Sequence, residues 1–151
     1  MRLNTRTDYA LRLLLYLQSS GERPASVREI AEAYAISTDH LTKVARELTL
    51  RGWIETRRGR HGGLLLAPRA LTLTVGDIVR ALEQGPPLVE CLGDHNTCPI
   101  VPACKLQSVL SRALSAFFAV LDDCTLADLA IDDAMMRALL DPLVTHETND
   151  S

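Results

Sequence analysis

The chain has 151 residues and a formal net charge of −3, and 47% of its residues are hydrophobic but only 4% aromatic. This length suits one small domain with an appended element, and a core built from aliphatic side chains favours helices. The apolar segments are too short to span a membrane and no signal peptide is recognisable, so we expect a cytoplasmic protein without a membrane partner.

Basic residues are concentrated in one segment of the chain. Residues 37–70 carry seven Lys or Arg against three Asp or Glu, whereas residues 71–151 carry four against twelve. Local charge, rather than the total, sets the attraction to phosphates. Residues 37–70 are therefore a candidate nucleic-acid contact, although charge alone leaves an ordinary solvated surface open.

Three helices are expected before residue 52. Residues 5–18 place leucines along one side of a helix. A Ser-x-x-Glu capping box that starts at Ser26 opens a short second helix. Ser37 can cap a third helix over residues 38–51, in which apolar residues recur at i, i+3, i+4 and i+7 from Leu41.

The outward face of this third helix is polar. Its side chains can reach phosphates or the edges of bases in the major groove. The candidate DNA-binding residues at this helix are Ser37, Thr38, Asp39, His40, Thr42, Lys43 and Arg46.

A β-hairpin with a basic loop is expected next. Residues 53–56 and 64–67 are predicted strands, and residues 57–63 form a glycine-rich turn. The candidate DNA-binding residues of this turn are Arg57, Arg58, Arg60 and His61. Two helices followed by a basic hairpin predict a winged helix-turn-helix that binds double-stranded DNA. A helical domain with a surface hairpin and no role with nucleic acids is the alternative.

A long helix is predicted over residues 104–121, after a short helix capped by Thr74. One of its two apolar stripes has the spacing of a helix–helix seam: Leu106, Leu110, Ala113, Phe117 and Val120. A helix that is apolar on two sides needs two partners, so we expect a homodimer. Thr125 can cap one more short helix, and residues 131–143 can add a last helical segment.

The fold class is therefore expected to be mainly α-helical with a small β-hairpin wing: a winged helix-turn-helix plus a long dimerisation helix. Four parts are predicted. A DNA-binding domain covers residues 1–84, a cysteine-bearing loop 85–104, dimerisation helices 105–144 and a disordered tail 145–151.

Three of the four cysteines fall within fourteen residues. Cys91, Cys98 and Cys104 could wrap around one metal centre, which is either an iron–sulfur cluster or a zinc ion with His95 as fourth ligand. Three unliganded thiols are the remaining alternative. Cys124 lies outside this loop and is read as a packing residue.

Several stretches resemble the Rrf2 family of bacterial winged-helix regulators. They are residues 7–12, the helix-turn-helix, residues 60–63, 73–78 and 125–129. Within the family, the block from Cys98 through residues 104–106 and 113–118 is most similar to nitric-oxide-sensing repressors. The resemblance implies a homodimeric repressor of a near-palindromic operator. It also implies one cluster per subunit on Cys91, Cys98 and Cys104, of the 4Fe-4S type, with 2Fe-2S or zinc as alternatives.

The resemblance also implies a fourth cluster ligand, Asp8 of the partner subunit, with Arg12 one turn further along the helix and close to the cluster. Asp8 can equally be a first-turn acid that pairs with Arg12 at i, i+4. A sister branch of the family places a histidine shortly after the third cysteine, and residues 105–108 contain none. An iron- or redox-responsive regulator of the same family, or a zinc-stabilised one, remains the alternative function.

We interpret the cluster as a tie between the cysteine loop of one chain and the DNA-binding part of its partner. Nitrosylation of the cluster would release this tie, change the spacing of the two recognition helices and derepress the target genes. An enzyme is not expected, because the four histidines (His40, His61, His95 and His146) lie in separate segments and form no obvious site.

Overall fold

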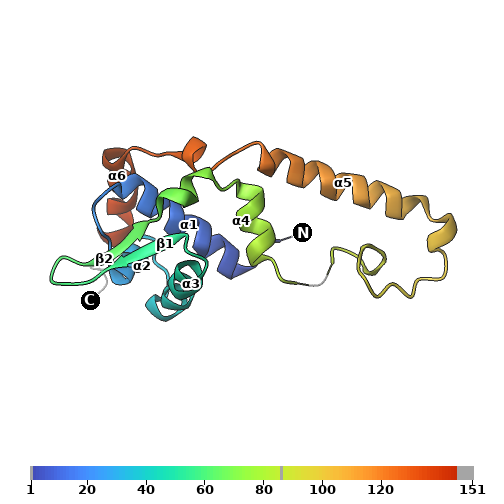
Figure 1. Ribbon diagram of the computed structural model, residues 1–151, viewed down its shortest axis with the longest axis horizontal. Coiled ribbons are helices and arrows are strands. Elements are labelled where there is room, and N and C mark those ends of the chain that lie inside the picture. Colours follow the sequence, from blue (N-terminus) through green and yellow to red (C-terminus); the bar gives the residue numbers. More distant parts are fainter. Residues whose placement is uncertain (1, 86, 146–151) are drawn as a thin grey trace.

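The computed structural model describes residues 2–85 and 87–145. A head and a projecting arm make up this part of the chain (Figure 1). The elements of the head are α1 (Thr5–Ser20), α2 (Val27–Ala33), α3 (Thr38–Leu50), β1 (Ile54–Arg57), β2 (Gly63–Leu66), α4 (Val75–Leu82) and α6 (Asp133–Thr145). The arm, residues 87–122, consists of the cysteine loop and the long helix α5 (Lys105–Asp122).

Helix α1 lies at the centre of the head. Asn4 caps it by accepting a hydrogen bond from the amide of Thr7, and its inward side chains Leu13, Leu14 and Leu17 are almost completely buried. It contacts α3, α4, α6 and β2. Because one helix supplies this apolar surface, the leucine periodicity of the first segment is also what fixes the core.

The hairpin pairs Ile54 with Leu66 and Arg57 with Gly63 in antiparallel register. Ala25, just before α2, bridges to Leu64 on the other side of β2. A Cβ at Gly63 would lie 2.8 Å from the Ala25 carbonyl oxygen, so glycine is what allows this close approach. The hairpin is thereby fixed to the start of α2.

Helix α5 meets the head only near its carboxyl end, where it contacts α4. Arg80 of α4 donates two hydrogen bonds to Asp122, at 2.6 and 2.7 Å, and stacks on the Phe118 ring. A Cβ at Gly76 would overlap Asp122, so this glycine makes room for the ion pair. The arm is therefore attached to the head through α4.

The predicted elements are found, with differences at their ends. Ser26 caps α2, but Glu29 does not complete a capping box, because its carboxylate instead binds Tyr16 and Arg23 from neighbouring segments. Ser37 is at the N-cap of α3 without a side-chain cap bond. Thr74 forms a complete capping box with Asp77.

At the carboxyl end, α6 is a full helix that packs on α1 and α2. Thr145 is its last residue, and the rest of the predicted tail, 146–151, lies outside the described residues. The side chains of Thr125 and Asp128 each accept a hydrogen bond from the other's backbone amide, but the helix here is a single 3-10 turn, Ala127–Leu129. Among the helices described here, none is long and apolar enough to cross a membrane.

Candidate DNA-binding face and cysteine loop

Helix α3 buries one face and exposes the other. Leu41, Val44, Ala45 and Leu48 are buried against α1 and α2. The seven candidate DNA-binding residues at this helix are all exposed: Ser37, Thr38, Asp39, His40, Thr42, Lys43 and Arg46. The apolar spacing of this helix therefore leaves a continuous polar face available to a ligand.

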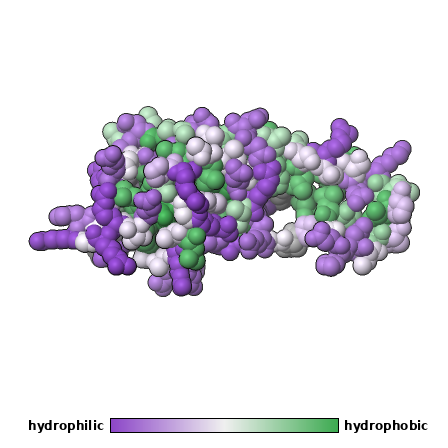
Figure 2. Space-filling view, viewed as in Figure 1, coloured by the Kyte–Doolittle hydropathy of each residue, from purple (hydrophilic) through white to green (hydrophobic). Residues whose placement is uncertain are grey.

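The loop of the hairpin extends the same basic surface. Arg57, Arg58, Arg60 and His61 are exposed, and hydrophilic side chains project from this loop at the left of Figure 2. Within residues 2–85 and 87–145, none of the recorded ion pairs involves the three arginines, Lys43 or Arg46. These charges are available to phosphates.

A cluster of charged groups holds the carboxyl end of α3 against α4. Glu47 binds Arg51 at 3.0 Å and Arg6 at 3.5 Å. Each arginine also donates to a carbonyl at the end of α4, Arg51 to Ala81 at 2.8 Å and Arg6 to Leu82 at 2.6 Å. The end of α4 is where the chain enters the cysteine loop, so this cluster joins α3 to the origin of that loop. The spacing of these residues in the sequence gave no signal of it.

The cysteine loop is held by hydrogen bonds next to its cysteines. Glu90 accepts from the amide and the hydroxyl of Thr97, at 2.9 and 2.5 Å, and these bonds lower the pKa of Glu90. Since Glu90 precedes Cys91 and Thr97 precedes Cys98, this contact closes the segment between the two cysteines. Gln107 of α5 donates to the Cys91 carbonyl at 2.7 Å.

Cys91, Cys98 and Cys104 are free and half-buried. Cys104 is at the N-cap of α5, where no side chain caps the helix and no acidic residue occupies the first turn. The unpaired amides of such a helix start favour an anionic group. In the described part of the chain, however, no three His, Cys, Asp or Glu side chains are grouped closely enough to hold a metal. His95 lies exposed in the same loop.

Asp8 and Arg12 lie on α1, in the head, whereas the cysteine loop lies at the far end of the arm (Figure 1). The Asp8 carboxylate accepts from Arg12 Nε at 3.2 Å, and Arg12 Nη2 lies 3.0 Å from it. Both side chains are close to half exposed. One protomer therefore does not bring Asp8 to its own cysteines.

Three kinds of comparison agree on the family. The Rrf2 family, described as "Iron-dependent Transcriptional regulator", matches residues 3–132. The chain belongs to the Rrf2 family. The resemblance inferred from the sequence motifs is confirmed. Rrf2 relatives named "HTH-type transcriptional regulator NsrR" are 46% identical in Geobacillus kaustophilus and 44% identical in Bacillus subtilis, each covering 93% of this chain and 97% of the relative.

Solved Rrf2 structures share the architecture. CymR of Bacillus subtilis, titled the global cysteine regulator, superposes with a TM-score of 0.70 at 30% identity, covering 86% of this chain and 96% of that one. IscR of T. potens gives 0.68 at 25% identity over 94% and 90%. The predicted mainly helical winged-helix fold is confirmed, and this chain is a DNA-binding transcription regulator rather than an enzyme.

Proposed function

We propose that the chain is a homodimeric transcriptional repressor that loses DNA affinity when nitric oxide reacts with an iron–sulfur cluster, of the 4Fe-4S type, on Cys91, Cys98 and Cys104. The observation that carries the proposal is a loop with three free, half-buried cysteines, the last of which, Cys104, is at the uncapped start of α5. The NsrR name of relatives at 40–46% identity supports the nitric oxide branch of the family.

The donor set fits such a cluster. Three thiolates within fourteen residues supply soft ligands, and the amides at the start of α5 stabilise the negative charge of a thiolate-bound cluster. When bound, the cluster supplies an iron with a weakly held fourth ligand that nitric oxide can attack. Gln107 and the Glu90–Thr97 contact position the backbone on either side of Cys91.

A fourth ligand from Asp8 of the partner subunit completes the set. The carboxylate is held by Arg12 on the same helix face and is only half buried, so a partner's loop can reach it. An oxygen ligand is harder than a thiolate and binds iron of the cluster less firmly. Asp8 would then connect the cluster of one subunit to the first helix of the other.

The dimer is proposed to form through α5. None of its residues is fully buried in one protomer, and apolar side chains are visible along the arm in Figure 2. The exposed apolar residues follow the 3-4 spacing of a coiled-coil seam: Leu106, Val109, Ala113, Ala116 and Val120. This row differs from the seam expected from the sequence, because Leu110 and Phe117 are half-buried.

Such a dimer presents two α3 helices and two wings to double-stranded DNA. A near-palindromic operator places its half-sites about one helical turn apart, and the two recognition helices must match that distance. Since α5 joins each head through the Arg80–Asp122 pair, a change at the cysteine end of the arm alters the relative position of the two heads.

Anaerobic reconstitution of single cysteine variants tests the cluster assignment. Iron and sulfide content is measured for the wild type and for Cys91→Ser, Cys98→Ser and Cys104→Ser, with Cys124→Ser as the matched control because Cys124 is also half-buried and free. We expect the three loop variants to lose the cluster and the control to retain it. A loop variant that keeps a full complement of iron, or colourless wild-type protein loaded with zinc, would contradict the proposal.

A further inference from the structure

A shallow apolar groove lies within the DNA-facing surface. It has a volume of about 330 Å³ and is formed by α3, the start of α2 and the hairpin. Its lining residues include Val27, Thr42, Thr49 and Leu50. Leu50 is 80% exposed. Arg46 lines the same groove and is exposed. We therefore expect its occupant to be an apolar feature carried by a polyanion.

Two of the three threonines that line the groove, Thr42 and Thr49, use their hydroxyls for hydrogen bonds within α3. Thr42 Oγ1 donates to the Thr38 carbonyl and Thr49 Oγ1 donates to the Ala45 carbonyl, each at 2.8 Å. A hydroxyl proton that is used within the helix is not free for a base. The outward contact group of Thr42 is therefore its methyl group.

The major groove of DNA offers one apolar group, the 5-methyl of thymine, and a threonine methyl is one of its recognised contacts. Thr42 is the fifth residue of α3, in the half of a recognition helix that meets base edges. Thr49 is the twelfth residue and lies toward the base of the hairpin. The position of Thr42 suits base readout, whereas that of Thr49 does not.

We propose that Thr42 reads one thymine in each operator half-site through contact between its methyl group and the thymine 5-methyl. The proposal rests on the DNA-binding part of the proposed function, and it is independent of the cluster and of nitric oxide. It assigns specificity to an apolar contact on a surface whose other side chains act through charge and hydrogen bonds.

The test uses the full-length protein and a duplex that the protein itself selects from a randomised DNA library. Each thymidine of the selected half-site is replaced in turn by deoxyuridine, which removes one methyl group and changes no hydrogen-bonding group. Losing one buried methyl contact is expected to weaken binding about fourfold per half-site. We expect this loss at one thymidine position of each half-site.

Two substitutions separate the methyl from the hydroxyl. Thr42→Val keeps a methyl in place and should keep the preference for thymidine over deoxyuridine. Thr42→Ser keeps only the hydroxyl and should bind the thymidine duplex and the deoxyuridine duplex equally. Thr49→Ser is the matched control and should discriminate as the wild type does. Circular dichroism melting checks that all variants are folded.

The outcomes are distinct. The inference is overturned if deoxyuridine weakens wild-type binding at no position, if Thr42→Ser keeps the wild-type penalty, or if Thr42→Val loses it. Failure to enrich any duplex from the library would instead contradict DNA binding itself, and the inference would fall with it.

Discussion

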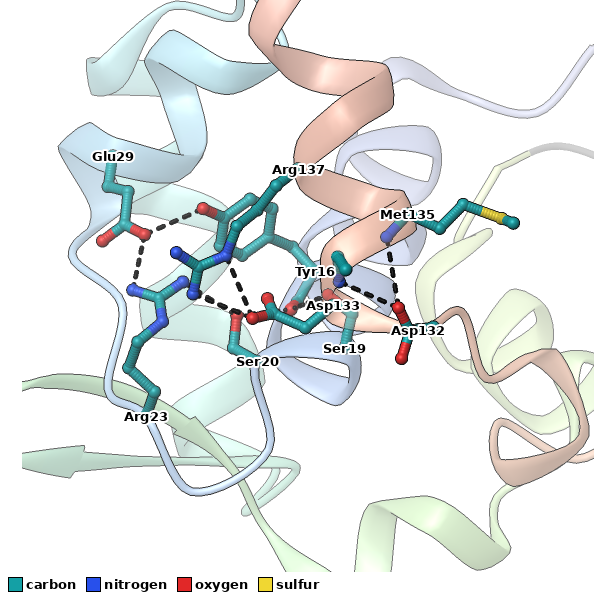
Figure 3. A network of polar contacts seen from close by, with 10 residues as sticks. Tyr16, Ser19, Ser20, Arg23, Glu29, Asp132, Asp133, Met135 and Arg137 are labelled. Atoms are coloured by element: carbon teal, nitrogen blue, oxygen red, sulfur yellow. Dashed lines mark hydrogen bonds and ion pairs between the residues drawn. The ribbon is translucent and has the colours of Figure 1, made fainter.

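Glu29 shows how one carboxylate can join three segments. It accepts from the Tyr16 hydroxyl at 2.8 Å and from Arg23 at 2.7 Å (Figure 3), beside the Arg137–Asp133 pair of α6. Burial acts to raise the pKa of Glu29, but the bonds from Arg23 and Tyr16 outweigh it and lower the pKa below 4.5. The ionised form is therefore what the folded state stabilises.

This lowered pKa sets a direction for acid stability. A carboxyl with a folded pKa below its unfolded value contributes stability above pH 4.5, and the contribution is lost as the pH falls through the folded pKa. We expect Glu29→Gln to cost about 1 kcal/mol at pH 7, because both partners are more than a third exposed and solvent screens the pair.

Urea unfolding at pH 7 and at pH 3 measures this difference. The penalty of Glu29→Gln should shrink at pH 3, while Glu32→Gln, in the exposed pair with Arg28, should be near neutral at both. Equal penalties for Glu29→Gln at the two pH values would refute the assignment.

Asp8 is the residue on which the proposed link between subunits depends. Asp8→Ala should leave the dimer intact and alter the lifetime of the cluster under nitric oxide, because it removes one proposed ligand and no apolar contact of α5. The lifetime is read from the decay of the cluster absorption, and Asp39→Ala, another exposed helix-start acid, is the control. An unchanged lifetime would remove Asp8 from the account.

Helix α4 is the element that connects the others. It packs against α5 through the pair of Arg80 with Asp122, and its last carbonyls accept from Arg51 and Arg6. Arg51 also stacks on the Trp53 ring. This helix therefore lies between the arm and the recognition helix.

Removing Arg51 should loosen this junction. We expect Arg51→Ala to lower the free energy of unfolding by about 1–3 kcal/mol, since it leaves the Ala81 carbonyl without its charged donor and Glu47 with Arg6 at 3.5 Å. Arg28→Ala, in an exposed pair, should change it by less than about 0.5 kcal/mol. Chemical denaturation of both variants measures the free energy of unfolding, and an equal loss in the two variants would contradict the role given to Arg51.

Much of this element structure could be predicted because it depends on local patterns. The leucine spacing of α1, the apolar stripe of α3 and the Thr74 capping box all act within a few residues. The partners of Glu29 could not be predicted, because Tyr16 and Arg23 lie thirteen and six residues away on other segments. Which apolar residues of α5 are exposed could not be predicted for a related reason: contacts with α4 and with the cysteine loop decide which side of the helix is covered. The expected helix–helix seam stays a prediction.

The candidate site was likewise predictable only in part. The exposure of the α3 face and of the wing follows from the sequence, because the buried stripe of α3 determines the opposite face. The groove at Thr42 does not follow from the sequence, because it forms only where the hairpin and α2 lie beside α3. Leu50 was the available signal: it is apolar, follows Thr49 and falls outside the buried stripe.

For the whole molecule, the apolar row on α5 should decide the oligomeric state. Val109→Glu places a charge in the middle of the row and should convert the dimer to a monomer, because burying an unpaired carboxylate against the partner helix is unfavourable. Ser108→Glu, one residue away and outside the row, should remain dimeric. Sedimentation equilibrium distinguishes the two, and a dimeric Val109→Glu would exclude α5 as the interface.

The central claim is that nitric oxide controls DNA binding through the cysteine loop. The direct measurement is an anaerobic titration of the cluster-loaded protein with nitric oxide, in which absorbance and DNA retardation are recorded on the same samples. The account predicts that the cluster absorption is bleached and that DNA is released over the same range of nitric oxide. Bleaching without any release of DNA, or release of DNA before the cluster is bleached, would contradict it.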